Sequence, residues 1–124
     1  MIIFNLVGIL YLVSGVWCAW QAQRSMEFLG YRSDDPHTLG EFITVYGGLQ
    51  IGIGLAMLLV NIWPQYYSGT LFFATVFSVV LIGMRLLTLV SFGFFAQGNM
   101  MAALEMAIAV ALLLVFLRHH ANMA

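Results

Sequence analysis

Four long stretches of apolar residues dominate the chain, and polar residues gather in the short segments between them. A transmembrane helix needs about 20 mostly apolar residues, and each stretch has roughly that length. The stretches are continuously apolar, whereas the strands of a membrane barrel alternate apolar and polar positions over segments of about 10 residues. The pattern therefore predicts four transmembrane helices, at residues 2–21, 39–62, 68–92 and 99–117.

Turn signals separate the predicted helices. A polar loop at residues 22–38 joins the first two, and Asp35-Pro36 within it is typical of a helix start, where Asp caps and Pro needs no N–H. Trp63-Pro64 ends the second helix at the membrane interface, and residues 96–99 form a tight turn. Short connections make successive helices antiparallel neighbours. We expect an all-α, polytopic four-helix transmembrane bundle of one domain with both termini on the same side.

Composition agrees with a membrane protein and excludes other classes. The chain is 63% hydrophobic and 7% charged, whereas soluble domains carry about 25% charged residues. It has four Arg, no Lys and a net charge of -1, so it offers no basic surface for a nucleic acid. A lone cysteine, Cys18, excludes an intramolecular disulfide and a cysteine-based metal site. The lipid bilayer is the partner that the composition predicts.

Two ionisable residues lie deep within predicted helices. Arg85 and Glu105 stand ten residues before and after Phe95, which is at the centre of the turn between the third and fourth helices. In an antiparallel hairpin they reach the same depth and can form an ion pair. Charged residues inside a membrane are expensive and mark candidate functional sites. The candidate polar layer comprises Arg85 and Glu105 together with Glu41, Tyr46 and Gln50 of the second helix.

Two interpretations of this layer stay open. In the first, Arg85 and Glu105 form a structural ion pair that fixes the register of two helices, because an arginine cannot neutralise itself and demands partners. In the second, the layer is a polar pocket open to one leaflet, which binds an anionic headgroup or exchanges a proton through a carboxylate.

Small residues form two stripes on the predicted helices. Gly48 and Gly52 have the spacing that lets membrane helices approach closely, and a buried Gln50 lies between them. We expect these stripes to pack helices within the bundle or between protomers. Their members are Gly47, Gly48, Gly52 and Gly54 on the second helix and Ala103, Ala107 and Ala111 on the fourth.

The combination of motifs resembles a bacterial family of small four-helix membrane proteins. It comprises Tyr46-Gly47-Gly48, Gly83-x-Arg85 followed by Ser91-x-Gly93, and Glu105 at the start of an apolar last helix. That family is a domain of unknown function near the DoxX-like group. The resemblance implies a four-helix fold, a multi-pass location in the inner membrane and a shared set of Tyr46, Arg85 and Glu105. The family tends to have an arginine shortly before the Tyr-Gly-Gly, where this chain has Glu41 and Thr44.

No sequence motif for catalysis is present: there is no catalytic Ser-His-Asp order, no phosphate-binding loop and no metalloprotease motif. We therefore expect no enzymatic activity, no cofactor and no metal site. The leading hypothesis is an accessory or structural subunit that associates with a partner or lipid, as a homo-oligomer or within a larger membrane complex. The alternative is an intramembrane binder or transporter of a small or amphipathic molecule at the Arg85–Glu105 layer. A third hypothesis is an intramembrane enzyme acting on a quinone or another lipid.

Overall fold

The computed structural model describes residues 1–30 and 35–123, and it is all-α. In these residues four helical stretches are long and apolar enough to cross a membrane, namely Ile2–Trp20, Pro36–Leu59, Pro64–Phe92 and Ala96–Met123. The prediction of four spans is therefore confirmed, but the tight turn predicted at residues 96–99 was wrong, because the chain reverses at residues 93–95 and α6 already begins at Ala96. The spans correspond to α1 (Ile2–Trp20), α3 (Pro36–Phe42) with η1 (Ile43–Leu49) and α4 (Gln50–Leu59), η2 (Pro64–Tyr66) with α5 (Tyr67–Phe92), and α6 (Ala96–Met123).

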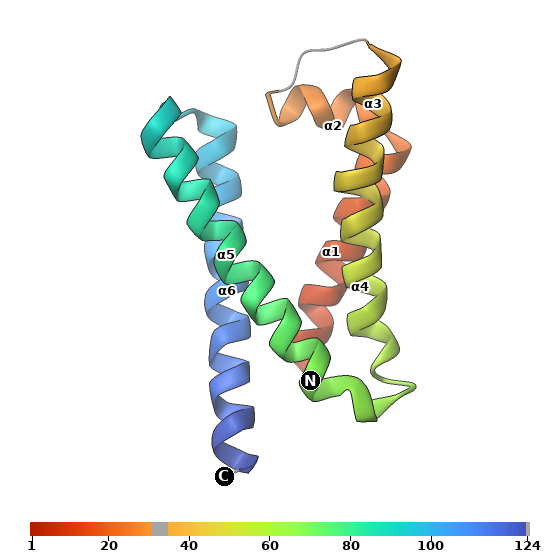
Figure 1. Cartoon of the computed structure of the whole chain (residues 1–124), viewed down its shortest axis with the longest axis vertical. Coiled ribbons are helices and arrows are strands. Elements are labelled where there is room, and N and C mark those ends of the chain that lie inside the picture. The colour runs from red at the N-terminus through yellow and green to blue at the C-terminus, as the bar shows by residue number, and fades with distance from the viewer. Residues whose placement is uncertain (31–34, 124) are drawn as a thin grey trace.

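The predicted polar loop at residues 22–38 is partly helical. Residues 22–28 form a short helix, α2 (Ala22–Phe28), that buries Ser25 and Met26 and lies across one end of the bundle (Figure 1). The helix start predicted at Asp35-Pro36 is confirmed, because a carboxylate oxygen of Asp35 accepts a hydrogen bond from the backbone N–H of Thr38 at 3.3 Å. The loop prediction was wrong at α2 because a helix of seven residues, about two turns, is too short to show a hydrophobic period in the sequence.

The second span contains a π-helical segment, η1, at the position of the Tyr46-Gly47-Gly48 motif. A π-helix bonds residue i to residue i+5, is rare, and is often found at functional sites. It joins α3 to α4 without a break in the helix. The wider turn adds a residue to each hydrogen-bonded ring, so it changes which side chains of the span face the interior.

The four spans are arranged as two pairs of helices. Figure 1 shows α1 running alongside α4 and α5 running alongside α6, with the pairs close at the end that carries both termini and further apart at the end that carries α2. The buried clusters follow the same division. One cluster joins all four spans near the termini, from Phe4 and Met57 to Leu71 and Leu112. The second cluster lies between α5 and α6, and the third joins α1 to α2 and α3.

Glycines hold α1 and α4 in direct backbone contact. A Cβ atom on Gly54 would lie 2.6 Å from the backbone nitrogen of Leu12, and one on Gly15 would lie 2.7 Å from that of Ile51. Gly8 and Gly47 are nearly as crowded. A Cβ atom on either glycine would lie 3.0 Å from a side-chain carbon of the neighbouring helix. No other residue type fits at Gly15 and Gly54 without separating the helices.

The packing role predicted for the small-residue stripes holds for some members only. Gly47 and Gly54 pack against α1, as expected, but a Cβ on Gly48 or Gly52 would meet nothing within 4 Å. On α6 the buried small residues are Gly98, Ala102 and Ala109, whereas Ala103 and Ala107 are exposed and Ala111 is half-buried. Gly48, Gly52, Ala103 and Ala107 therefore do not pack against another helix of this chain, and for them packing between protomers stays a prediction.

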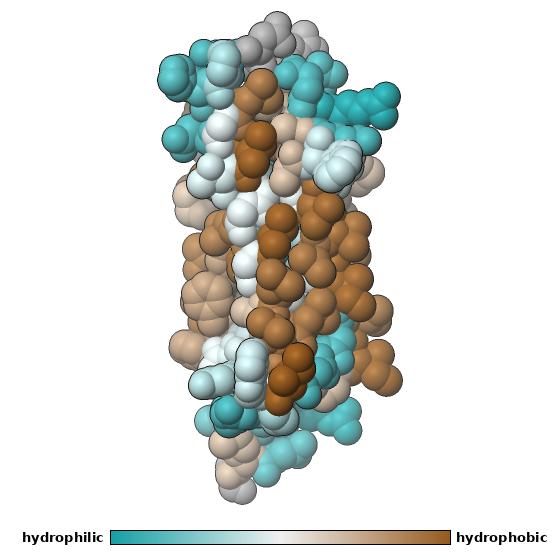
Figure 2. Space-filling view, turned by 90° about the vertical axis from the view of Figure 1, so that its right-hand side faces the viewer, coloured by the Kyte–Doolittle hydropathy of each residue, from teal (hydrophilic) through white to brown (hydrophobic). Residues whose placement is uncertain are grey.

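An apolar belt surrounds the middle of the molecule. Figure 2 shows apolar side chains across the central part of one face and hydrophilic residues at both ends. Many large apolar side chains of the spans are exposed, including Leu6, Val13, Val80 and Leu114. Such a surface is suited to hydrocarbon, so the bilayer is the environment in which this fold is stable.

The α1–α4 contact gives the first prediction. Gly54→Ala places a methyl group against backbone atoms, and we expect it to lower the free energy of unfolding by about 1–3 kcal/mol. The matched control is Gly52→Ala, two residues away on the same helix, which adds the same methyl group to open space and should not lower stability, because alanine is the better helix former. Unfolding by SDS titration in bicelles measures both. Equal effects of the two substitutions would contradict a backbone contact at Gly54.

Candidate functional site

An ion pair between α5 and α6 is the centre of the candidate site. Arg85 donates from Nε to Oε2 of Glu105 at 3.0 Å and from Nη2 to Oε1 at 2.8 Å. Two parallel bonds between guanidinium and carboxylate are the strongest geometry for such a pair. The Glu105 residue is 8% exposed, and the Arg85 side chain is 24% exposed. The pairing predicted from the position of the turn is confirmed.

The turn between α5 and α6 sets the register of this pair. α5 ends at Phe92, and the next residue, Gly93, has a φ of 107°, which favours glycine. The backbone N–H of Asn99 donates to the carbonyl of Phe95 at 2.8 Å and starts α6. The Phe95 ring lies over Gly98, where a Cβ would be 2.5 Å from a ring carbon. This tight reversal brings residues equally distant from Phe95 to the same depth.

A cavity of about 210 Å³ lies beside the ion pair and reaches Arg85. Its walls come from both helix pairs: the end of α2, the π-helical segment, α5 and the α5–α6 turn. Tyr46 forms part of the wall, and its ring is stacked on that of Phe42 with 4.7 Å between centroids. The lining residues are Leu29, Gly30, Tyr46, Arg85 and Phe95. The cavity thus combines two hydrogen-bonding side chains with apolar walls.

Two other members of the predicted layer have different surroundings. Gln50 lies one helical turn beyond Tyr46, and its Oε1 atom is buried without a hydrogen-bond partner among the described residues. Unsatisfied polar atoms inside proteins are uncommon and call for an explanation. Glu41 is exposed on α3, and no hydrogen bond or ion pair joins it to the pair within the described residues. The structure therefore brings Tyr46 to Arg85 and leaves Glu41 outside.

A buried hydrogen bond between α1 and α5 was missed by sequence reasoning. The hydroxyl groups of Tyr11 and Ser78 are 3.0 Å apart, and both residues are buried. This bond links α1 of one helix pair to α5 of the other. The only signal in the sequence was a hydroxyl in each apolar stretch, which is common in membrane helices.

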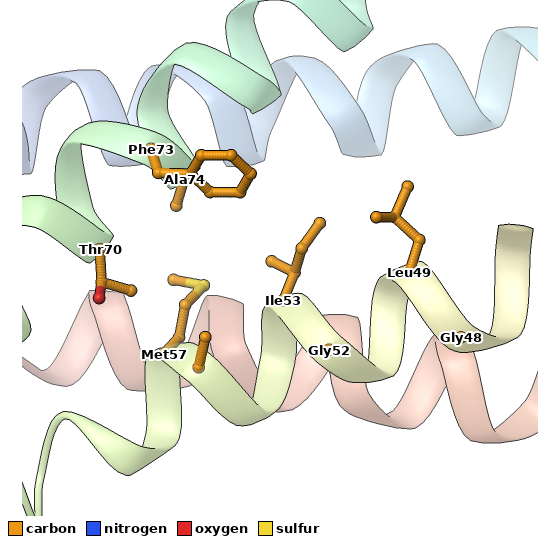
Figure 3. Close-up of a pocket in the computed structure, with 9 residues that line it drawn as sticks. Gly48, Leu49, Gly52, Ile53, Met57, Thr70, Phe73 and Ala74 are labelled. Carbon is orange, nitrogen blue, oxygen red and sulfur yellow. The ribbon is translucent and has the colours of Figure 1, made fainter.

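An apolar groove runs along α4 and α5 and has a volume of about 240 Å³. Figure 3 shows Leu49, Ile53 and Met57 extending from the second span toward Phe73 and Ala74 of α5. Gly48 and Gly52 lie in its floor and leave it open. On the second span, Tyr46 lines the cavity at Arg85, and the residues that line the groove follow it in the sequence, from Gly48 to Met57.

Neither a protein-family model, nor a curated protein, nor a solved structure matches this chain. The resemblance to the DoxX-like neighbourhood therefore stays a prediction. The four apolar spans support the coarser statement that this is a small four-helix membrane protein.

The ion pair gives the second prediction. Arg85→Leu or Glu105→Leu alone leaves a charge without its counter-charge in a low-dielectric layer, which costs about 3–5 kcal/mol in soluble proteins; snorkelling reduces that cost in a bilayer. Each single variant should lower the yield of folded protein sharply. The double leucine variant should recover much of the yield because both charges are absent. Exchanging the two residues should recover less, since the site is shaped for a long side chain on α5.

Size-exclusion chromatography of the four variants in mild detergent measures the folded yield. Single variants that fold like the parent protein, or a double variant that loses the sum of both effects, would show that the two residues do not depend on each other.

Proposed function

We propose that this protein binds an amphipathic molecule between its two helix pairs, with the polar end beside Arg85 and Tyr46. The observation that supports the proposal is the cavity at Arg85, whose walls come from both pairs. A pair that served only to fix the register of α5 and α6 needs no such hollow. The cavity is 210 Å³ in volume, so it suits a headgroup rather than a whole lipid.

The polar end of the ligand is a hydrogen-bond acceptor. The side chains that line the cavity and bear polar groups are Arg85, which only donates, and Tyr46, whose hydroxyl can donate. Glu105 balances the charge of Arg85, so the site favours a carbonyl, hydroxyl or carboxyl group over a multiply charged one. An acceptor in this position would be held at the depth of the ion pair.

The apolar part of the ligand lies in the groove between α4 and α5. The groove is lined almost entirely by carbon, with Thr70 as its polar member. The two hollows share no lining residue, and on α5 Arg85 stands eleven residues after Ala74. A ligand that occupies both must therefore extend about 16 Å along the bundle. The glycines in the floor of the groove provide the necessary width, which explains why Gly48 and Gly52 do not pack against another helix of this chain.

We further propose that the protein is not an enzyme and that it resides in a bacterial inner membrane with both termini on one side. Four crossings would return the chain to the side from which it started, and the position of both termini at one end of the bundle (Figure 1) supports this proposal. The described lining of the cavity offers one guanidinium and one phenol and no nucleophile next to a base. The inner membrane is what the resemblance to the bacterial family implies.

Photolabelling tests the binding proposal. The probe is palmitic acid with a diazirine in the middle of its chain, added to the protein in detergent, and the labelled peptides are identified by mass spectrometry. We expect labels on Ile53 and Phe73 that unlabelled palmitate prevents. Tyr46→Phe removes one hydrogen bond of about 1 kcal/mol. About five times more unlabelled palmitate should then be needed to prevent labelling. Gly52→Leu fills the groove and should abolish labelling.

The control for the groove variant is Gly83→Leu, which adds the same side chain to open space on α5, outside both hollows. It should label like the parent protein. Labels spread over all exposed apolar faces, unaffected by unlabelled palmitate or by either variant at Tyr46 or Gly52, would contradict the proposal.

A second candidate function is that of a subunit in a homo-oligomer or larger membrane complex. The observation that favours it is that Ala103 and Ala107 are exposed one turn apart on the outer face of α6, where a helix of another chain could approach closely. Such a contact lies on a different face from the groove, so the two functions are compatible.

Cysteine crosslinking in native membranes tests this candidate. In a Cys18→Ala background, Ala107→Cys should form a disulfide-linked species, because close helix contact places the two thiols within bonding distance. The control is Leu113→Cys, a residue that is also exposed on α6 but faces another direction. Only monomer from Ala107→Cys, or equal crosslinking of both variants, would contradict an interface at Ala107.

A further inference from the structure

A second cavity, of about 500 Å³, lies at the end of the bundle that carries the termini. Its polar wall is formed by Tyr67 of α5 and by Arg118, His119 and Asn122 of α6. The Oγ atom of Ser68 is 2.8 Å from Nε2 of His119, and the Tyr67 ring packs edge-on against the imidazole with 4.9 Å between centroids. These contacts hold the imidazole in place beside Arg118.

Side-chain charges are divided unequally between the two ends of the bundle. The chain has five acidic side chains: Glu105 is paired with Arg85, and the other four are Glu27, Asp34, Asp35 and Glu41. These four lie in residues 27–41, the segment that includes the connection between α1 and the second span. The end with Arg118 has no side-chain carboxylate of its own, and Arg118 forms no ion pair in the described part of the chain. Arg118 is therefore exposed at this end without a counter-charge among the described residues, where an external anion can reach it.

Aromatic residues indicate that this cavity lies at the depth of lipid headgroups. Trp63 and Tyr66, at the turn that precedes α5, are 48% and 61% exposed. Trp and Tyr gather where a membrane meets water, and Tyr67, the next residue, lines the cavity itself. The apolar wall, which includes Ile2, Ile3 and Val115, continues toward the hydrocarbon.

We propose that this cavity binds the phosphodiester group of an anionic phospholipid, with Arg118 as its main ligand. A guanidinium matches a phosphate with paired N–H donors. The Asn122 amide adds a further donor, as does Nδ1–H of His119 in the tautomer whose Nε2 accepts from Ser68. The lipid chains leave along the apolar wall into the bilayer. This site is separate from the cavity at Arg85 and does not depend on the function proposed for that cavity.

The test measures binding of phosphatidylglycerol and phosphatidylcholine by native mass spectrometry of the full chain in detergent. Both lipids carry the phosphate, but only the first has a net negative charge. We expect the parent protein to prefer phosphatidylglycerol, and Arg118→Gln to weaken its binding about fivefold, since one cation near an anionic headgroup contributes about 1 kcal/mol. His119→Gln should have a smaller effect in the same direction.

Two controls separate this site from general charge effects and from the first cavity. Arg24→Gln removes an exposed cation on α2, at the other end of the bundle, and Tyr46→Phe alters the cavity at Arg85. Both should keep the preference of the parent protein. Because Arg118 is exposed, Arg118→Gln should fold, and its melting temperature without lipid checks this; Arg118→Lys, which keeps the charge, should retain most of the preference.

Three results would overturn the proposal. In the first, Arg118→Gln binds phosphatidylglycerol as tightly as the parent protein does. In the second, Arg24→Gln loses as much binding as Arg118→Gln, which shows attraction to the whole molecule rather than to this cavity. In the third, millimolar inorganic phosphate displaces the lipid as readily as added phosphatidylglycerol does, which indicates a site for free phosphate.

Discussion

The arrangement of the bundle depends on the need of a guanidinium for a counter-charge inside the membrane. Arg85 cannot lose its proton, so the chain supplies Glu105 at the same depth and commits α5 and α6 to one register. The other two long spans meet through backbone contact at glycines and need no charge at all. Two pairs with such different chemistry share a core only near the termini. Toward the end that carries α2, the two helix pairs leave a cavity between them, and Arg85 lines it.

Most of the fold could be predicted from the sequence because the bilayer imposes a minimum length on each apolar stretch. That constraint is strong enough to locate four spans and the turn at Phe95, and hence the depth of the ion pair. It says little about which face of a helix points inward. The predicted glycine stripe contained Gly47 and Gly54, which contact α1, but also Gly48 and Gly52, which contact no other helix. On α6 the predicted stripe began at Ala103, whereas the neighbouring Ala102 is the buried residue. The π-helical turn also rotates the side chains of the second span about its axis, and no sequence pattern predicted that turn.

The candidate site was predictable to the extent that it rests on charge. A buried arginine demands a carboxylate, so pairing followed from depth alone, and Tyr46 followed from its place in the same layer. The cavity itself depends on Leu29 and Gly30, which belong to a helix end and a turn that carried no periodic pattern. The Tyr11–Ser78 bond depends on the relative placement of two helices that are distant in sequence. Contacts between the pairs are tertiary, and one sequence does not define them.

The glycines of the second span also determine when that span can be helical. Each glycine in a helix costs about 1 kcal/mol relative to alanine in water, and four lie within residues 47–54. A peptide of this segment would be unstable as a helix in water, where its backbone can bond to solvent. Hydrocarbon removes that competitor, because every N–H and C=O must then bond within the chain. For this span, insertion into the membrane and helix formation are therefore one event, whereas the alanine- and leucine-rich α6 can become helical beforehand.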